Sequence, residues 1–282
     1  SFSKRSKGRS PVNPCGAGIK GKGSTVVAGH IPSSVLVRWS LVTAQKKVHG
    51  VTLDGWLPEQ SDFERLMQRS GVNRNSKVVI TSKGEKALHM AMAARLYLSL
   101  RYYGHQTVAL LDGGTAAWIQ NGGKVKFGRS RAKRGDFKAG SGKPQWIATL
   151  GEIRNLSMSG NEAVRLLDNR ESAAFLGLAK PLKKVEEKWK GHVPGAANLP
   201  LSHLVNTMGP SATLFKPDTL RRVMKLSNID LSKPTVFYCN SGVMASMGWF
   251  VFHELLGNGT VRLYDGSMQE WVAAKGPVEG MP

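Results

Sequence analysis

The hydrophobic and polar positions along the chain predict two rounds of strand and helix. Short apolar runs typical of buried strands occur at residues 78–80 (VVI) and 235–238 (TVFY). After each run comes a longer segment with helical spacing of apolar residues, at 87–104 and 243–257, and both segments end at a glycine. Strands that alternate with helices predict a parallel sheet covered by helices on both faces.

The same motifs occur twice and in the same order, which indicates an internal repeat. The matching pairs are GHIPSSVLV at Gly29 with GHVPGAANL at Gly191, SKVVITSKGEKA at Ser76 with SKPTVFYCNSGVMA at Ser232, and TVALLDGGTAAW at Thr107 with TVRLYDGSMQEW at Thr260. We therefore expect two similar α/β domains. They are called here the first repeat, residues 29–123, and the second repeat, residues 145–282.

Basic residues are concentrated outside the two repeats. The chain carries 40 Lys and Arg against 19 Asp and Glu, a formal net charge of +21. Two stretches rich in basic residues and glycine, 1–28 and 124–144, are typical of a tail or strand remnant and of a linker. Such charge attracts polyanions without sequence preference, and no RNA-binding motif accompanies it. We expect at most weak polyanion or RNA binding through the tail and the linker.

Composition excludes several classes of protein. The 282 residues are 41% hydrophobic and 21% charged, as in globular domains, and no apolar run is long enough for a membrane span or a secretion signal. The cysteines, Cys15 and Cys239, are too few for a disulfide framework, and no Cys/His cluster has zinc spacing. We expect neither a metal nor a cofactor. The mitochondrial matrix and the bacterial cytoplasm or periplasm remain open as compartments.

Cys239 lies at the end of an apolar strand and is followed by a short polar turn, NSGVM. A cysteine in this place is by itself most often a core residue. The glycine-containing turn that follows favours a reactive cysteine over a core residue. A loop from Cys239 to Met244 can direct its backbone N–H groups and the N-terminus of the following helix at the sulfur. Those donors favour the thiolate, so we expect a thiol pKa below the free value of about 8.5. Gly242 allows the turn, while Asn240, Ser241 and Val243 complete the loop. Cys15 has no such context.

The motifs LLDNR (166–170), GHVPGAANLP, FYCNSGVMAS and YDGSMQEW resemble those of the two-domain rhodanese-like sulfurtransferases, which include thiosulfate and 3-mercaptopyruvate sulfurtransferases. The resemblance implies two tandem α/β domains, each a parallel sheet flanked by helices, with the active cysteine of the second domain facing the first across a cleft. It also implies that Cys239 takes sulfane sulfur from a small anionic donor and passes it to a thiol or cyanide. No LLDxR motif precedes Gly29, so the first domain is expected to be clipped at its N-terminus.

The two repeats differ at the reactive position. Ser82 stands in the first repeat where Cys239 stands in the second, and a hydroxyl cannot carry sulfane sulfur, so the first repeat is expected to be catalytically silent. The resemblance implies that Asp168 and Arg170 form a structural ion pair that supports the loop. Asp265, in YDGSMQEW, is interpreted mainly as a turn residue.

The loop sequence favours 3-mercaptopyruvate over thiosulfate as the sulfur donor. Within the family, CRKGVT-like loops accompany thiosulfate and CGSGVT-like loops accompany mercaptopyruvate, and CNSGVM is nearer the second. The arginine that the family places four residues after that of LLDxR is replaced by Ala174. Three lysines of the following segment are candidates for binding the donor's anionic groups: Lys180, Lys183 and Lys184.

Two other functions are alternatives to sulfur transfer. A phosphatase-like enzyme would need arginine at the sixth position after the cysteine, where Ala245 lies, and is excluded. The remaining alternative is a rhodanese-like pair that serves as a binding or structural component of a ribonucleoprotein, with reduced or no catalysis. The net charge and Ala174 favour it, and the intact Cys239 loop disfavours it.

Overall fold

The computed structural model describes residues 29–159, 163–179 and 190–281. The strands are β1 (Ala44–Val48), β2 (Val51–Trp56), β3 (Val78–Ile80), β4 (Val108–Leu110), β5 (Ile147–Ala148), β6 (Arg165–Asp168), β7 (Ala197–Asn198), β8 (Val205–Asn206), β9 (Thr213–Leu214), β10 (Thr235–Tyr238) and β11 (Arg262–Tyr264). The α-helices are α1 (Gln60–Arg69), α2 (Ala87–Tyr102), α3 (Gly114–Gln120), α4 (Leu150–Ser159), α5 (Ser172–Phe175), α6 (Pro217–Leu226), α7 (Val243–Phe250) and α8 (Ser267–Ala273). Short 3-10 turns are η1 (Trp39–Leu41), η2 (Pro144–Trp146) and η4 (Leu201–His203), and a π-helical turn, η5 (Val251–Leu255), extends α7.

The second repeat is built on a five-stranded parallel sheet with the order β5-β11-β10-β6-β7. The side chains of its central strand, β10, alternate between two cores. Val236 and Tyr238 pack in the core that contains Trp271 of α8. Phe237 and Cys239 lie in the opposite core, which the second repeat shares with the first. Cys239 therefore faces the first repeat.

The first repeat keeps only part of this plan. In the described residues its parallel sheet consists of β3 and β4, paired from Val78 with Val108 to Ile80 with Leu110. An antiparallel hairpin, β1–β2, precedes α1, and a shorter antiparallel pair, β8–β9, occupies the corresponding place in the second repeat. The expected α/β architecture with a parallel sheet in each repeat is confirmed, whereas the sequence pattern did not predict the two hairpins. Residues 1–28, expected to form a basic tail or the remnant of a strand of the first repeat, lie outside the described residues.

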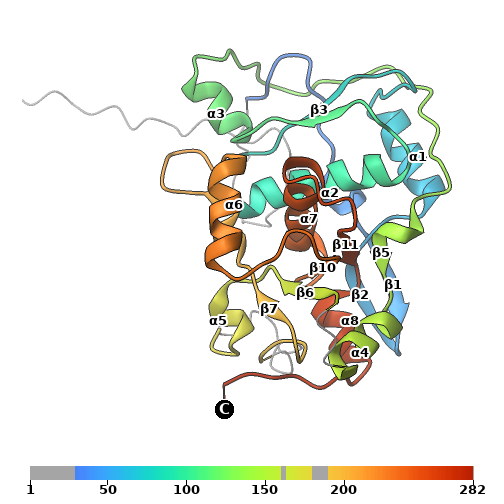
Figure 1. Cartoon of the computed structure of the whole chain (residues 1–282). Helices are drawn as coiled ribbons and strands as arrows, with labels where there is room; N and C mark the ends of the chain where they lie inside the picture. The colour runs from blue at the N-terminus through green and yellow to red at the C-terminus, as the bar shows by residue number, and fades with distance from the viewer. Residues whose placement is uncertain (1–28, 160–162, 180–189, 282) are drawn as a thin grey trace, which may run out of the picture.

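Helices α2 and α7 occupy corresponding places in the two repeats and pack against each other at the centre of the molecule (Figure 1). The rings of Tyr97 and Phe250 meet edge to face at 4.8 Å, and Arg101 pairs with Glu254 at 3.2 Å. One continuous apolar cluster runs from Phe63 in the first repeat to Leu167 in the second. The repeats thus share one core, and burial of that apolar surface holds them together.

The basic segment 124–144, expected to be a linker, packs against the first repeat along part of its length. The main chain of Lys126 pairs with that of His30. Phe137 is 1% exposed, and its ring lies 5.9 Å from the ring of Phe63. The N–H of Gly135 donates to the carbonyl of Gln68 at 2.8 Å. A single apolar side chain in the middle of a basic segment gives no periodic pattern, so the burial of Phe137 could not be predicted.

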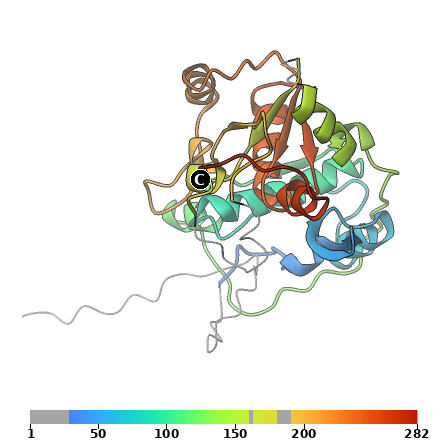
Figure 2. The same cartoon turned by 90° about the horizontal axis from the view of Figure 1, so that it is seen from below.

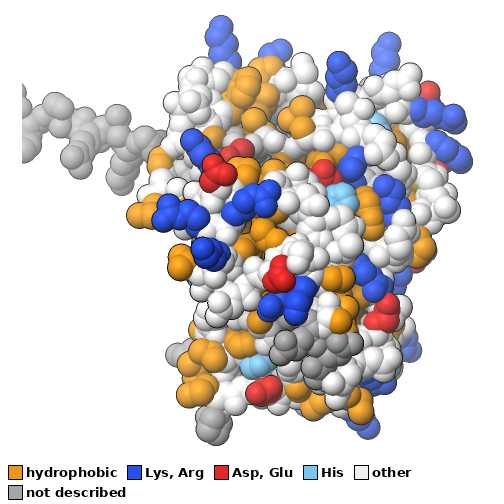
Figure 3. Space-filling model, viewed as in Figure 1, with side chains coloured by type: hydrophobic (Ala, Val, Ile, Leu, Met, Phe, Trp, Pro, Cys, Tyr) orange, Lys and Arg blue, Asp and Glu red, His pale blue; other side chains and the backbone are white. Residues whose placement is uncertain are grey.

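Lysine and arginine side chains are spread over the face drawn in Figure 3 and do not gather in one patch. Within the described ranges, no helix combines the length and the apolar composition that a membrane crossing requires. The same ranges hold no group of three or more His, Cys, Asp or Glu side chains placed to bind a metal ion.

Candidate functional site

The carboxyl ends of three neighbouring parallel strands bring the candidate residues together. Cys239 follows β10, Asp265 and Ser267 follow β11, and Asp168 ends β6. Because β10 lies between the other two strands, these residues gather around Cys239 at one edge of the sheet. Ligands of open parallel sheets bind at this edge.

The Cys239 thiol is buried and is approached by backbone N–H groups. Cys239 is 1% exposed. Burial raises the pKa of the Cys239 thiol above its ordinary value, while hydrogen bonds from the N–H groups of Ala245, Ser241 and Met244 act to lower it, and the carboxylate of Asp168 adds to the increase. The predicted N–H donors are therefore present, but the expectation of a lowered pKa is wrong for the free protein, because burial outweighs them.

Gly242 sets the shape of the Cys239 loop, residues 239–244. Its φ of +78° lies in the left-handed region, and α7 begins at the next residue. A Cβ at Gly242 would lie 2.8 Å from Oδ1 of Asp265. Glycine is required by both the backbone and the space, as expected from the sequence. The remaining loop residues are half-buried: Asn240, Ser241, Val243 and Met244.

Ser267 ties the two ends of the loop together. Its hydroxyl accepts hydrogen bonds from the N–H of Cys239 at 3.2 Å and of Gly242 at 3.0 Å, and donates to the carbonyl of Tyr264 at 2.9 Å. The next residue along, Met268, donates its N–H to the Cys239 carbonyl at 3.0 Å. The start of α8 thus fixes the main chain on both sides of the thiol.

The expected ion pair between Asp168 and Arg170 forms behind the loop. Both residues are at most 2% exposed, and Nη2 of Arg170 lies 2.5 Å from Oδ2 of Asp168. The same guanidinium donates to the carbonyl of Gly191 at 2.7 Å, while the Leu199 N–H donates to the Asp168 carbonyl at 2.9 Å. The pair joins β6 to the turn around His192, and such a pair supports position more than stability.

The first repeat covers the Cys239 loop with its β1–β2 hairpin, which lies beside α8 in Figures 1 and 2. A Cβ on Gly55 of β2 would lie 2.8 Å from Cβ of Ser241, so the hairpin contacts the loop directly. The N–H of Leu57 donates to Oδ2 of Asp265 at 2.7 Å, and the Gln269 side chain donates to the carbonyl of Asp54.

The second repeat covers the corresponding loop of the first. The Thr115 N–H donates to the Ser82 carbonyl at 2.9 Å, as Met268 donates to Cys239, so the backbone places Ser82 in the position of the cysteine. The N–H of Ala212, which immediately precedes β9, donates to the carbonyl of Gly84 at 2.6 Å. Each repeat therefore covers the loop of the other with its own hairpin.

The candidate donor-binding residues are not brought together by the described structure. Lys180, Lys183 and Lys184 lie outside the described residues. Ala174 lies in α5 and offers no charge. His30 and His192 each join their main chain to another segment in an isolated β-bridge, with Lys126 and Glu279 respectively.

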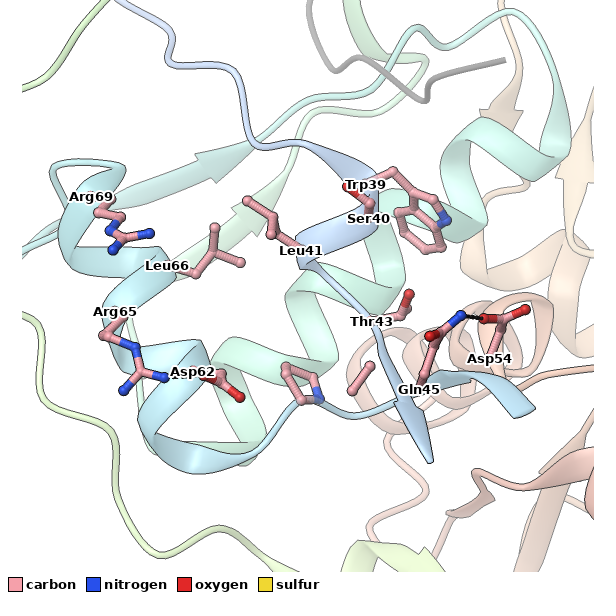
Figure 4. Close-up of a pocket in the computed structure, with 12 residues that line it drawn as sticks. Trp39, Ser40, Leu41, Thr43, Gln45, Asp54, Asp62, Arg65, Leu66 and Arg69 are labelled. Atoms are coloured by element: carbon pink, nitrogen blue, oxygen red, sulfur yellow. Dashed lines mark hydrogen bonds and ion pairs between the residues drawn. The ribbon is translucent and has the colours of Figure 1, made fainter. Parts of the chain in front are cut away.

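A cavity of about 720 Å³ lies on the first repeat, outside the Cys239 loop (Figure 4). Its lining residues are Trp39, Ser40, Leu41, Thr43, Ala44, Gln45, Asp54, Pro58, Asp62, Arg65, Leu66 and Arg69. None of them belongs to the second repeat, so this cavity is not the site of the thiol chemistry.

Three residues at the site were missed by sequence reasoning: Gly55, Arg95 and Ser267. Arg95 is fully buried in α2 and lies 2.6 Å from Asp265. A single arginine inside the apolar run AMAARLYL was the signal that could have found it. Ser267 has a φ of +54°, which sequence alone does not reveal.

Comparisons with known proteins agree with this architecture. The rhodanese-like domain family matches residues 24–121 and 149–274, one match in each repeat. The 3-mercaptopyruvate sulfurtransferase of Mus musculus is 31% identical over 227 residues, which cover 79% of this chain and 71% of the mouse protein. A protein of Haloferax volcanii, provisionally named a thiosulfate sulfurtransferase, is 29% identical over 89% of this chain and 83% of its own length.

A solved structure has the same arrangement of domains. The crystal structure of SseA from Escherichia coli, described as a 3-mercaptopyruvate sulfotransferase with the rhodanese fold, covers 85% of this chain and 83% of its own, with a TM-score of 0.69 and 27% identity. The chain therefore belongs to the rhodanese-like domain family and carries one such domain in each repeat.

Proposed function

We propose that the chain is a sulfurtransferase that carries sulfane sulfur on Cys239 as a persulfide. The general class, a sulfurtransferase, rests on family membership and on relatives that bear that name. The assignment of the chemistry to Cys239 rests on one observation: the residue lies between the carboxyl end of β10 and the N-terminus of α7, where the N–H groups of Ala245, Ser241 and Met244 act to lower the pKa of its thiol. Donors in that position stabilise negative charge on a sulfur atom.

The chemistry takes place in two transfers. The Cys239 thiolate attacks the sulfur of 3-mercaptopyruvate, an S–S bond forms, and the C–S bond breaks with its electron pair passing to the pyruvate enolate. The proton of the donor's thiol ends on the enolate carbon, which gives pyruvate. An acceptor thiolate or cyanide then attacks the outer sulfur and releases the Cys239 thiolate. Covalent storage of this kind divides one difficult transfer into two easier ones.

The buried thiol requires that the negative charge be stabilised when sulfur is transferred. The same N–H groups would stabilise the anionic outer sulfur of a persulfide, so one loop serves both the thiolate and the persulfide. Half-buried Ser241 offers a hydroxyl that donates to the oxygen of the leaving enolate.

Mercaptopyruvate is the proposed donor in preference to thiosulfate. Asn240 and Ser241 are neutral at the mouth of the loop, where a dianion would be stabilised by cations. A monocarboxylate donor needs less positive charge than thiosulfate does.

A cyanide-coupled assay with each donor tests the proposal. Wild-type protein should form thiocyanate with a higher kcat/KM for mercaptopyruvate than for thiosulfate. Cys239→Ser should abolish turnover with both donors, whereas the matched change Cys15→Ser should leave it intact. Turnover by Cys239→Ser would disprove the assignment, and a higher kcat/KM for thiosulfate would disprove the donor preference alone.

The ribonucleoprotein alternative gains no support from these observations. The relatives compared are named as sulfurtransferases, and the basic residues on the face in Figure 3 are dispersed.

A further inference from the structure

Arg95 is a charged side chain with no access to solvent. It lies in the middle of α2, in the first repeat, and is 0% exposed. A buried guanidinium is strongly unfavourable unless other groups compensate its charge and its N–H donors. The groups that hold Arg95 therefore indicate what it does.

Its partners come from both repeats. Nη2 donates to the carbonyl of Gly55 at 2.6 Å and lies 2.6 Å from Oδ1 of Asp265. Nη1 donates to the hydroxyl of Ser246 at 3.5 Å. One guanidinium thus connects α2, the β1–β2 hairpin, the segment after β11, and α7.

Each of these partners also contacts the Cys239 loop. Gly55 packs against Ser241. The Ser246 hydroxyl donates to the carbonyl of Gly242 at 2.8 Å. A Cβ at Gly242 would lie 2.8 Å from Oδ1 of Asp265 and 3.2 Å from Nη1 of Arg95. The guanidinium therefore lies beside Gly242 and beneath the contact of the hairpin with Ser241, whose N–H acts on the thiol.

The pseudo-symmetry of the repeats shows that the fold does not require this ion pair. In the first repeat Asp112 corresponds to Asp265, and it accepts the Leu214 N–H at 2.8 Å as Asp265 accepts that of Leu57 at 2.7 Å. Counted back from the glycines that end the two helices, the position of Arg95 corresponds to Gly248 in α7. Among the described residues, Asp112 forms no ion pair with a cation.

We infer that Arg95 is a positioning residue for sulfur transfer, an inference that rests on the proposed function of Cys239. Its guanidinium, fixed on Asp265 and Gly55, holds Ser241 and Gly242 so that the loop N–H groups point at the sulfur. In the part of the chain that the structure describes, the ion pair lies beneath the repeat that carries the thiol and has no counterpart beneath the other loop. The silent first repeat thus supplies a residue on which the reactivity of the second depends.

Substitution of Arg95 tests this role in a Cys15→Ser background, where iodoacetamide can alkylate only Cys239. Arg95→Met should raise the midpoint of the pH profile of alkylation by about one unit and lower kcat about tenfold, because misaligned donors stabilise the thiolate less. Arg95→Lys keeps the charge but cannot reach all three partners, so its kcat should also fall. A wild-type midpoint in Arg95→Met, or wild-type kcat in Arg95→Lys, would overturn the inference.

The matched control is Arg101→Met. Arg101 joins the same two helices through Glu254 at 3.2 Å, away from the loop. Its substitution should lower Tm and leave both the alkylation midpoint and kcat unchanged. An equal shift of the midpoint in Arg101→Met would show that any weakening of the interface has this effect, and would overturn the specific role of Arg95.

A double variant distinguishes a loss of activity caused by poor folding from one caused by loss of positioning. Arg95→Met with Asp265→Asn removes both buried charges, and the Asn side-chain oxygen can still accept the Leu57 N–H, so Tm should recover relative to Arg95→Met while kcat stays low. Recovery of kcat together with Tm would mean that Arg95 serves stability only. Alkylation needs no sulfur donor, so a wild-type protein inactive with every donor would refute the proposed function and leave the test of Arg95 intact.

Discussion

The hydroxyl of Ser267 accepts a hydrogen bond from the backbone N–H of Cys239 at 3.2 Å, while the same oxygen accepts a second from Gly242 at 3.0 Å. Ser267 makes these bonds from a left-handed backbone, with φ +54°. The first repeat has Gly114 in the corresponding place, with φ +58°. Glycine would adopt this conformation without strain. The presence of serine at this position of the second repeat is therefore explained by the hydrogen bonds that its hydroxyl makes.

Two substitutions separate the hydroxyl of Ser267 from its backbone. Ser267→Ala and Ser267→Gly both leave two buried N–H groups without an acceptor, which costs about 1–3 kcal/mol for each group. Glycine should recover about 1 kcal/mol of this loss, since it relieves the left-handed conformation. We expect kcat to fall about tenfold in both variants, because the pKa of the Cys239 thiol should rise by about one unit when the loop N–H groups lose their alignment. Chemical denaturation and steady-state kinetics measure the two effects, and wild-type kcat in Ser267→Gly would refute the role of the hydroxyl.

The contact between Gly55 and Ser241 can be tested with a control in the same hairpin. Gly55 and Gly50 both have positive φ, +91° and +79°, so alanine at either position costs about 1 kcal/mol of backbone strain. Only at Gly55 would the new methyl group meet Ser241, while nothing lies within 4 Å of a Cβ at Gly50. Gly55→Ala should therefore lower kcat/KM more than its loss of stability explains, and Gly50→Ala should lower stability alone. Equal kcat/KM values in the two variants would mean that the hairpin does not act on the loop.

The first repeat should remain inactive even when it is given a thiol. Ser82 lies at the position of the cysteine, but its hydroxyl faces Sδ of Met90 at 3.7 Å, and Ala212 of the second repeat bonds to Gly84 of its loop. We expect Ser82→Cys in a Cys239→Ser background to form no thiocyanate from either donor. Turnover in that double variant would show that the first repeat retains a working loop and is not intrinsically silent.

The raised pKa of Cys239 predicts how the reactivity of its thiol depends on pH. Burial is the largest influence and raises this pKa, so the thiol of the free protein is mainly protonated at neutral pH. The rate of alkylation of Cys239 by iodoacetamide should therefore keep increasing as pH rises through 8, without a plateau near neutrality. Because the folded protein disfavours the thiolate, the pKa of Cys239 is higher in the folded state than in the unfolded state. Cys239 should therefore contribute stability at pH values below its unfolded pKa, and this contribution should be lost as the pH rises through its folded pKa. A plateau below pH 7 would show that the N–H donors outweigh burial.

Sequence patterns predicted the fold and the strand, turn and helix around Cys239 because these features depend on local signals. The strand before Cys239, the turn at Gly242 and the helix that begins at Val243 each follow from residue types that are adjacent in the chain. The repeat of these signals was enough to predict two domains. The ion pair of Asp168 with Arg170 is also local, because a single residue, Asn169, separates the partners.

The parts that sequence did not predict depend on contacts between distant segments. Arg95 meets Asp265 across 170 positions of the chain, and Gly55 meets Ser241 across the interface between the repeats. The raised pKa of Cys239 was missed for a related reason, because burial is contributed by the whole shared core while the donors lie in the neighbouring turn.

Mass spectrometry of the Cys239 peptide tests the central claim most directly. After incubation with 3-mercaptopyruvate and no acceptor, the wild-type protein should gain the mass of one sulfur atom on Cys239, and cyanide should remove it with release of thiocyanate. The gain should be absent from Cys239→Ser and unchanged in Cys15→Ser. A stoichiometric sulfur adduct on Cys15, or thiocyanate formation with no adduct on Cys239, would contradict the account.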